Sequence, residues 1–235
     1  MKVPWLPKRQ IAHAAESLIA DYGNVIGGKL TPPIPVEDMI EKYFHIQLGV
    51  LDFENELGMK GVLGATYVDA RVICVDESLF QSGCEGRFTF TCAHEVGHWV
   101  LHRRYVKKAN RGGPEEIAII CRLEKAKEPI EWQADYFASS LLMPEDAVRK
   151  TFHKLCGGSP LVLENVGRTF HSSSLFIEPC VQNWPLIAEA AIYNGGFENV
   201  SKQAMIIRLQ DLGLVINNTP EALGWPKAAC GSINL

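Results

Sequence analysis

The sequence predicts an α+β fold, in which helices pack on a small antiparallel sheet. Two helical patterns come first, at residues 8–22 and 36–44. Three short β-like runs follow them, at residues 45–50, 61–68 and 71–75. Helical patterns then return and continue to residue 212. Strands that are grouped in the chain, rather than alternating with helices, are typical of α+β proteins.

The first helix is predicted from apolar residues at helical spacing, and Gly23 ends it. These apolar residues are Ile11, Ala14, Ala15, Leu18 and Ile19. A proline-rich connector leads to the short second helix. A tight turn at Asp69-Ala70 joins the last two strands. The run at residues 61–68 is either an edge strand, which could bind an extended peptide by strand addition, or an ordinary sheet strand.

Two longer helices are predicted at residues 88–102 and 129–143. Pro129 is compatible with the first turn of the second one, where a missing N–H loses no hydrogen bond. The link at residues 103–128 is polar and rich in turn residues. Its apolar run at residues 117–123 is either a strand or a buried helical turn, because periodicity does not separate the two. A further helix is predicted from Pro144 to the glycines at 157 and 158.

Composition sets the broad class of the protein. A chain of 235 residues with 47% hydrophobic and 21% charged residues is typical of a folded globular protein. The net charge of -4 disfavours nucleic acid as a partner. We find no signal-peptide core, and no apolar run approaches the ~18 residues of a spanning helix. The 7 cysteines form no CxxC pair, which is typical of reduced thiols, so we expect a cytoplasmic protein.

The motif His94-Glu95-Val96-Gly97-His98 is the central observation. Residues four apart share one face of a helix, so His94 and His98 can hold one zinc ion through ring nitrogens. Glu95 lies beside that pair and is placed to act as a general base on a water molecule. Chance produces such a motif in a chain of this length about once in a hundred sequences. Apolar neighbours on the same helix predict that the motif is half-buried, and buried ionisable groups need partners.

A catalytic zinc site needs a third protein ligand. The second long helix offers Glu131 and Asp135, which are also four residues apart. We assign Glu131 as the third ligand. We assign Asp135 to the outer shell, where it would accept the remaining N–H of a ligand histidine, with His94 as the expected partner. The reverse assignment of the two carboxylates is the alternative.

His102 continues the histidine spacing but is not expected to be a ligand. The outer two of three such histidines on a straight helix are ~12 Å apart, which is too far to share one ion. We therefore interpret His102 as a helix-end residue that is favoured near the C-terminal dipole.

The two motifs together resemble the ImmA/IrrE-type metallopeptidase family. The first is His94-Glu-Val-Gly-His-Trp-Val-Leu-His102, and the second is Glu131-Trp-Gln-Ala-Asp-Tyr-Phe-Ala-Ser-Ser-Leu-Leu-Met-Pro144. More distantly they resemble the thermolysin-like zincins. The resemblance implies a zincin-like core over residues 1–158 and an intracellular zinc endopeptidase. It also implies a protein substrate, such as a helix-turn-helix repressor of a mobile element or a stress regulon.

Residues 159–235 are predicted to form a C-terminal helical segment. Two helices, at residues 185–193 and 201–212, are joined by a Gly-Gly turn and resemble a helix-turn-helix. Over 185–217 the charges are Lys202 and Arg208 against Glu189, Glu198 and Asp211, a net of −1. A phosphate-binding module should be basic, so direct nucleic-acid binding is not expected. The segment is expected to pack on the first domain or to recognise substrate.

A second interpretation is a zinc-binding sensor or regulatory protein that hydrolyses little or nothing. The intact Glu95 argues against it, because a sensor needs no general base. An enzyme that requires an activating partner would have the same sequence features. Several groups could stabilise an oxyanion, and the residues do not choose among Tyr67, Tyr136 and His171.

Overall fold

The computed structural model describes residues 3–81, 85–105, 118–122, 128–163, 170–171, 176–177 and 183–218. Contacts divide the chain into two compact units. Unit 1 contains Met1–Pro144 together with Phe197–Ser201, and unit 2 contains Glu145–Gly196 together with Lys202–Leu235. The domain boundary at residue 158 stays a prediction.

Unit 1 is built from helices around one small sheet, so the α+β class is confirmed and is consistent with the expected zincin-like core. Its elements are α1 (Lys8–Ile26), α2 (Val36–Asp38), the π-helix η1 (Met39–Tyr43), β1 (Gln47–Leu51), α3 (Phe53–Leu57), β2 (Val62–Tyr67), β3 (Val72–Asp76), α4 (Ser78–Gln81), α5 (Glu85–Gly97), the π-helix η2 (His98–His102), β4 (Ala118–Arg122) and α7 (Pro129–Leu142).

The sheet is mixed, so the prediction of a wholly antiparallel sheet is wrong. The strand order is β1-β3-β2-β4. β2 and β3 form the expected antiparallel hairpin, but β1 pairs with β3 in parallel. The parallel pair arises because α3 separates β1 from β2, so β1 need not fold back on its neighbour in the chain.

β2 lies inside the sheet, so residues 61–68 form an ordinary sheet strand, and the alternative of an edge strand is wrong. Its second neighbour is β4, which pairs with it antiparallel from Tyr67 opposite Ala118 to Val62 opposite Arg122. The apolar run at residues 117–123, which the sequence pattern left as either a strand or a helical turn, thus contains the strand β4. Short apolar runs acquire their secondary structure from their neighbours in space, which the sequence pattern does not contain.

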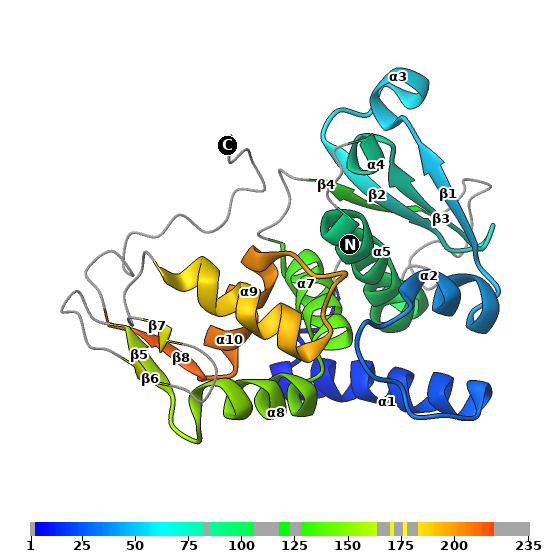
Figure 1. Ribbon diagram of the computed structural model, residues 1–235. Helices are drawn as coiled ribbons and strands as arrows, with labels where there is room; N and C mark the ends of the chain where they lie inside the picture. The colour runs from blue at the N-terminus through cyan, green and yellow to red at the C-terminus, as the bar shows by residue number, and fades with distance from the viewer. Residues whose placement is uncertain are drawn as a thin grey trace. The chain divides into compact units, whose positions relative to one another are not determined.

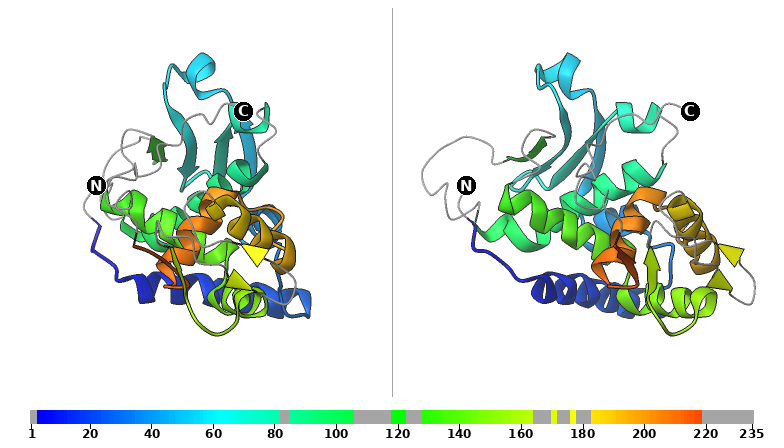
Figure 2. Two further views of the ribbon diagram at one scale, coloured as in Figure 1. Left: turned by 60° about the vertical axis from the view of Figure 1, so that its left-hand side comes forward. Right: turned by 90° about the vertical axis from the view of Figure 1, so that its left-hand side faces the viewer.

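Helices cover one face of this sheet in successive layers (Figures 1 and 2). α5 packs on β2 and β3 and also against α7, and α7 packs in turn on α1. Apolar residues on every side of α5 are buried, including Cys92, Ala93 and Val96 at 0% exposure. The polar side chains of α5 and α7 that face each other therefore lie in the interior of the unit.

Gly97 allows α5 and α7 to cross closely. A Cβ atom at Gly97 would lie 3.2 Å from the Cα atom and 3.2 Å from the carbonyl oxygen of Ala134, and 3.2 Å from Phe137. Glycine in a helix interior costs about 1 kcal/mol relative to alanine, so its presence here has a steric reason. This crossing brings the motif of α5 against the carboxylates of α7.

Replacement of Gly97 by valine is expected to lower the free energy of unfolding by about 1–3 kcal/mol, because the added carbons must push two packed helices apart. Chemical denaturation measures this loss. The matched control is Gly28→Val, since a Cβ at Gly28 meets nothing within 4 Å. Equal stability of the two variants would contradict the close crossing as the reason for this glycine.

Unit 2 contains the C-terminal helices that the sequence predicts. Its elements are α8 (Glu145–Cys156), β5 (Leu161–Leu163), β6 (Phe170–His171), β7 (Phe176–Ile177), α9 (Trp184–Gly195), α10 (Lys202–Asp211) and β8 (Val215–Asn217). α9 packs on α10 and α8, and β5 pairs with β8 in parallel. Across both units, the helices that the structure describes include none long and apolar enough to cross a membrane.

Candidate metal centre

Three buried side chains from the two crossing helices meet in the interior of unit 1. His94 and His98 project from the end of α5 and the start of η2, and Glu131 projects from the first turns of α7. Their exposed fractions are 4%, 0% and 3%. His94 Nε2 lies 3.2 Å from Glu131 Oε2, and His98 Nε2 lies 3.6 Å from Glu131 Oε1. The Nε2 atom of each imidazole thus faces the carboxylate of Glu131.

This cluster fits a metal ion. One potential ligand atom from each of the three residues lies within 4.8 Å of the other two. Two imidazoles and a carboxylate are a common ligand set for catalytic zinc, which keeps a further position open. His98 Nε2 is buried and has no hydrogen-bond partner among the residues that the structure describes. A buried polar atom without a partner is costly, and a metal ion in the cluster would satisfy it.

Asp135 lies on the other side of the His94 ring. Its Oδ1 atom is 2.8 Å from His94 Nδ1, while the carboxylate itself remains partly exposed. A carboxylate in this position accepts the Nδ1–H proton and leaves the lone pair of the ring on Nε2. Asp135 therefore contacts Nδ1 of His94, and Glu131 contacts Nε2 of the same ring. Of these two carboxylates, Glu131 is the one that also faces His98.

Glu95 is fully buried between α5 and the sheet. Thr66 of β2 donates a hydrogen bond of 2.6 Å from its hydroxyl to Glu95 Oε2. The other oxygen, Oε1, has no hydrogen-bond partner among the described residues. It lies against Gly64, where a Cβ atom would be only 2.5 Å away. Gly64 and Thr66 of the strand thus hold the carboxylate of Glu95 in place.

Burial and mutual charge shift the ionisation of this cluster. Burial raises the pKa of Glu95 to about 7, against the smaller lowering effects of His94 and the Thr66 hydrogen bond. Burial also lowers the pKa of His98. Burial alone would raise the pKa of Glu131, but the neighbouring rings of His94 and His98 hold it well below its usual range. Glu131 is therefore a carboxylate and His98 a neutral ring, the forms in which both bind metals.

Three residues around this cluster, His102, Gln133 and Thr66, were given no site role from the sequence. His102 is the last residue of η2, as expected of a helix-end residue, but it is 0% exposed and its Nδ1 atom lies 2.9 Å from His98 Nδ1. Burial lowers the pKa of His102 to about 4. Gln133 lies 3.2 Å from the other nitrogen of His102. The spacing of four residues between His98 and His102 was the signal for this contact, whereas nothing in the sequence singled out Thr66 or Gln133.

The structure describes the neighbours of two of the three oxyanion candidates, Tyr67 and Tyr136. Tyr67 packs against the apolar cluster of Phe53, Val62 and Ala65. Tyr136 stacks on Trp132 at 5.8 Å between ring centroids, with Lys8 over its ring. The side chain of His171 lies outside the described residues.

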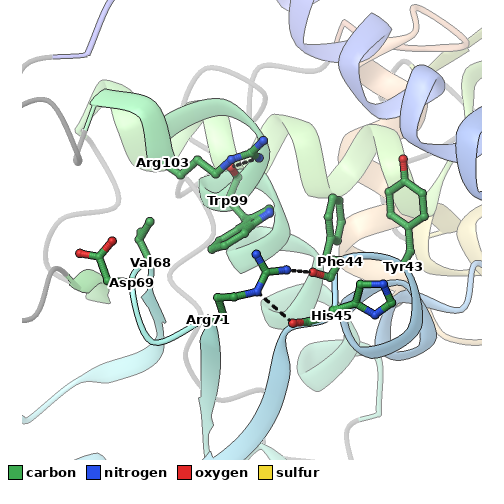
Figure 3. A pocket seen from close by; sticks show the side chains of 8 residues that line it. All are labelled: Tyr43, Phe44, His45, Val68, Asp69, Arg71, Trp99 and Arg103. Carbon is green, nitrogen blue, oxygen red and sulfur yellow. Dashed lines mark hydrogen bonds between the residues drawn. The ribbon is translucent and has the colours of Figure 1, made fainter.

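A separate cavity of about 610 Å³ opens elsewhere on unit 1 (Figure 3). It is lined by Tyr43, Phe44, His45, Val68, Asp69, Arg71, Trp99 and Arg103. Arg71 donates to the carbonyl oxygens of Phe44 and His45, and Arg103 donates to the carbonyl oxygen of Trp99 over 2.7 Å. These arginines thus bind the backbone around the cavity. None of the three clustered residues lines it.

The fold and the cluster together define an α+β protein with a buried His-His-Glu cluster, between two crossing helices, that fits a metal ion. Residues 46–158 match the sequence model of a peptidase family that is described as the IrrE N-terminal-like domain. This match confirms the resemblance to ImmA/IrrE-type metallopeptidases over these residues. A search of curated proteins gives no match.

Proposed function

We propose that the protein is a zinc-dependent endopeptidase, with His94, His98 and Glu131 as the metal ligands and Glu95 as the general base. The observation that carries this proposal is the cluster of three ligand atoms within 4.8 Å, next to a buried glutamate. Membership of a peptidase family supports the reaction class. Two histidines and a carboxylate favour zinc over the hard cations, which prefer oxygen ligands alone.

Zinc in this position would supply Lewis acidity for a water molecule and for the scissile carbonyl group. The protein supplies the proton transfers. Glu95 would take a proton from the attacking water and return it to the leaving amine. A carboxyl group whose pKa is about 7 is suited to both steps at neutral pH. Thr66 holds one oxygen of Glu95, so the other oxygen, Oε1, is the one left to exchange the proton.

Asp135 would act as an outer-shell residue in this proposal. By accepting the Nδ1–H of His94, it would fix the ring orientation and raise the basicity of the ligand. Its partly exposed carboxylate stays outside the buried ligand set, which supports the choice of Glu131 as third ligand.

The proposed substrate is a protein in the cytoplasm, and a helix-turn-helix repressor is the candidate that the family resemblance implies. The segment at residues 159–235 is proposed to pack on the peptidase domain or to recognise this substrate. Direct DNA binding is not proposed for its helix pair, because Arg208 is buried and Lys202 pairs with Glu189 at 2.9 Å. Arg208 is thus not accessible to phosphates, and Glu189 offsets the charge of Lys202.

Chelation tests the metal requirement. Dialysis against a chelator is expected to abolish cleavage of the protein substrate, and one equivalent of zinc is expected to restore it. The substrate would be a repressor encoded beside the gene, and mass spectrometry would identify the cut. Zinc binding without cleavage would favour the alternative, a zinc-binding regulatory or sensor protein. Cleavage that persists without metal would contradict the proposal.

Replacement of Gly64 by alanine is expected to lower the cleavage rate by up to about a hundred-fold, the size of effect that a misplacement of about 1 Å produces. The added methyl group would lie 2.5 Å from Glu95 Oε1 and must displace the carboxylate. Zinc content should not change, because the nearest atoms to an added Cβ all belong to Glu95 and not to the proposed ligands. The control is Gly49→Ala in β1, where the nearest atom to a Cβ is 3.5 Å away. A fully active Gly64→Ala enzyme would argue against Glu95 as the base.

A further inference from the structure

A chain of buried polar side chains leads from His98 to the N-terminal segment. His98 Nδ1 lies 2.9 Å from His102 Nδ1, and His102 Nε2 lies 3.2 Å from Gln133 Oε1. Gln133 Nε2 donates to the carbonyl oxygen of Pro4 over 3.0 Å. The three side chains are each 0% exposed. The hydrogen-bonded path from His98 Nδ1 to Pro4 thus runs through buried side chains.

The far end of the chain determines the direction of each hydrogen bond. The carbonyl oxygen of Pro4 can only accept, so the amide of Gln133 must direct its NH₂ group to Pro4 and its Oε1 to His102. Oε1 can also only accept, so His102 must carry a proton on Nε2. A charged ring at this position would be fully buried without a carboxylate in hydrogen-bond contact, which is costly. His102 is therefore neutral, and its Nδ1 atom is an acceptor.

The same logic sets the tautomer of His98. Because His102 Nδ1 accepts, His98 must donate from Nδ1, and its lone pair is then on Nε2. His98 Nε2 is the atom that faces Glu131 at 3.6 Å and has no hydrogen-bond partner within the described part of the chain. The hydrogen bonds thus leave the lone pair of His98 directed into the three-residue cluster.

We infer that His102 and Gln133 are positioning residues, which fix His98 in the tautomer that binds the metal and are anchored by the carbonyl group of Pro4. This inference rests on the proposed function, since it concerns the same metal centre. The two ligand histidines then have different partners: His94 has the carboxylate of Asp135, and His98 has a neutral imidazole. Loss of an outer-shell partner of this kind lowers metal affinity by about 10–100-fold.

Three replacements test the inference by zinc affinity. His102→Leu removes the acceptor and should weaken zinc binding by about 10–100-fold. His102→Asn places an amide oxygen near the position of Nδ1 and should keep most of the affinity. Gln133→Met frees His102 to move its proton to Nδ1, which would force the His98 proton onto Nε2. Zinc must then compete with that proton for His98 Nε2, so zinc binding should weaken. Competition with a chromophoric chelator measures each dissociation constant, and exposed His13 provides the control, His13→Leu.

A second measurement does not depend on activity or on how well the variants fold. Proton–nitrogen correlation spectra of the isotope-labelled, metal-free wild type distinguish the two neutral histidine tautomers. The expected result is a proton on Nδ1 of His98 and on Nε2 of His102. The opposite tautomers, or wild-type zinc affinity in both His102→Leu and Gln133→Met, would overturn the inference. A wild type with the expected tautomers that binds no zinc would instead support this network and overturn the proposed function.

Discussion

Replacement of Glu95 by glutamine is expected to lower the cleavage rate by about a hundred-fold to ten-thousand-fold, which is the usual contribution of a general base. Zinc should still bind with one equivalent, because Glu95 is not among the three clustered residues. Glutamine has the same shape and can still accept the hydrogen bond of Thr66. The fold should therefore persist, since a neutral amide replaces a carboxyl group whose charge burial already disfavours.

Steady-state kinetics and metal analysis of the same preparations separate the outcomes for Glu95. The exposed glutamate of α1 gives a matched control, Glu16→Gln, which should cleave and bind zinc like the wild type. Cleavage by Glu95→Gln at the wild-type rate would remove Glu95 from the mechanism. Loss of zinc from this variant would mean that Glu95 contributes to the metal site and is not only a base.

Replacement of Glu131 by alanine is expected to abolish both zinc binding and cleavage. Of the two carboxylates of α7, Glu131 is the one that faces both histidines, at 3.2 Å and 3.6 Å. Without Glu131 only two imidazoles remain as ligands. The zinc affinity should therefore fall by more than about 100-fold, which is the largest effect of an outer-shell change. Replacement of Asp135 by alanine should weaken zinc by about 10–100-fold, because it removes only the partner of His94 Nδ1.

The two α7 variants should be measured together, by equilibrium zinc titration under identical conditions. The ratio of their dissociation constants tests which carboxylate is the ligand. A larger loss in Asp135→Ala than in Glu131→Ala would reverse the assignment. Thermal unfolding of both metal-free proteins shows whether either change acts through stability instead of through the ligand set.

Helix geometry explains why so much of the candidate centre was predictable. Residues four apart on one helix share a face, so the spacing of His94 and His98 and that of Glu131 and Asp135 each predicted a local cluster. The structure does bring His94, His98 and Glu131 together. The roles of these residues stay predictions. Most helix bounds were also close, because caps and apolar periodicity are local signals. The prediction that Gly23 ends the first helix is wrong, because α1 continues to Ile26 and ends at Gly27.

Interactions between distant segments were not predictable in the same way. The pairing of β1 with β3 and of β4 with β2 depends on which strands meet in space, and strand patterns are alike for either arrangement. The surroundings of His102 depend on α7 and on the N-terminal segment, which lie far from it in sequence. A π-helical turn at His98–His102 also departs from the straight α-helix that the distance argument assumed.

The place of β4 has a consequence for any peptide that approaches the sheet next to Glu95. Both hydrogen-bonding sides of β2 are taken, by β3 and by β4. β4 belongs to the same molecule, and a tethered segment competes with a free one at an effective concentration on the order of millimolar. A peptide could form backbone hydrogen bonds with β2 only by strand exchange against that internal competitor. Short unstructured peptides at micromolar concentration would be poor competitors, whereas a folded partner with additional contacts could outcompete β4.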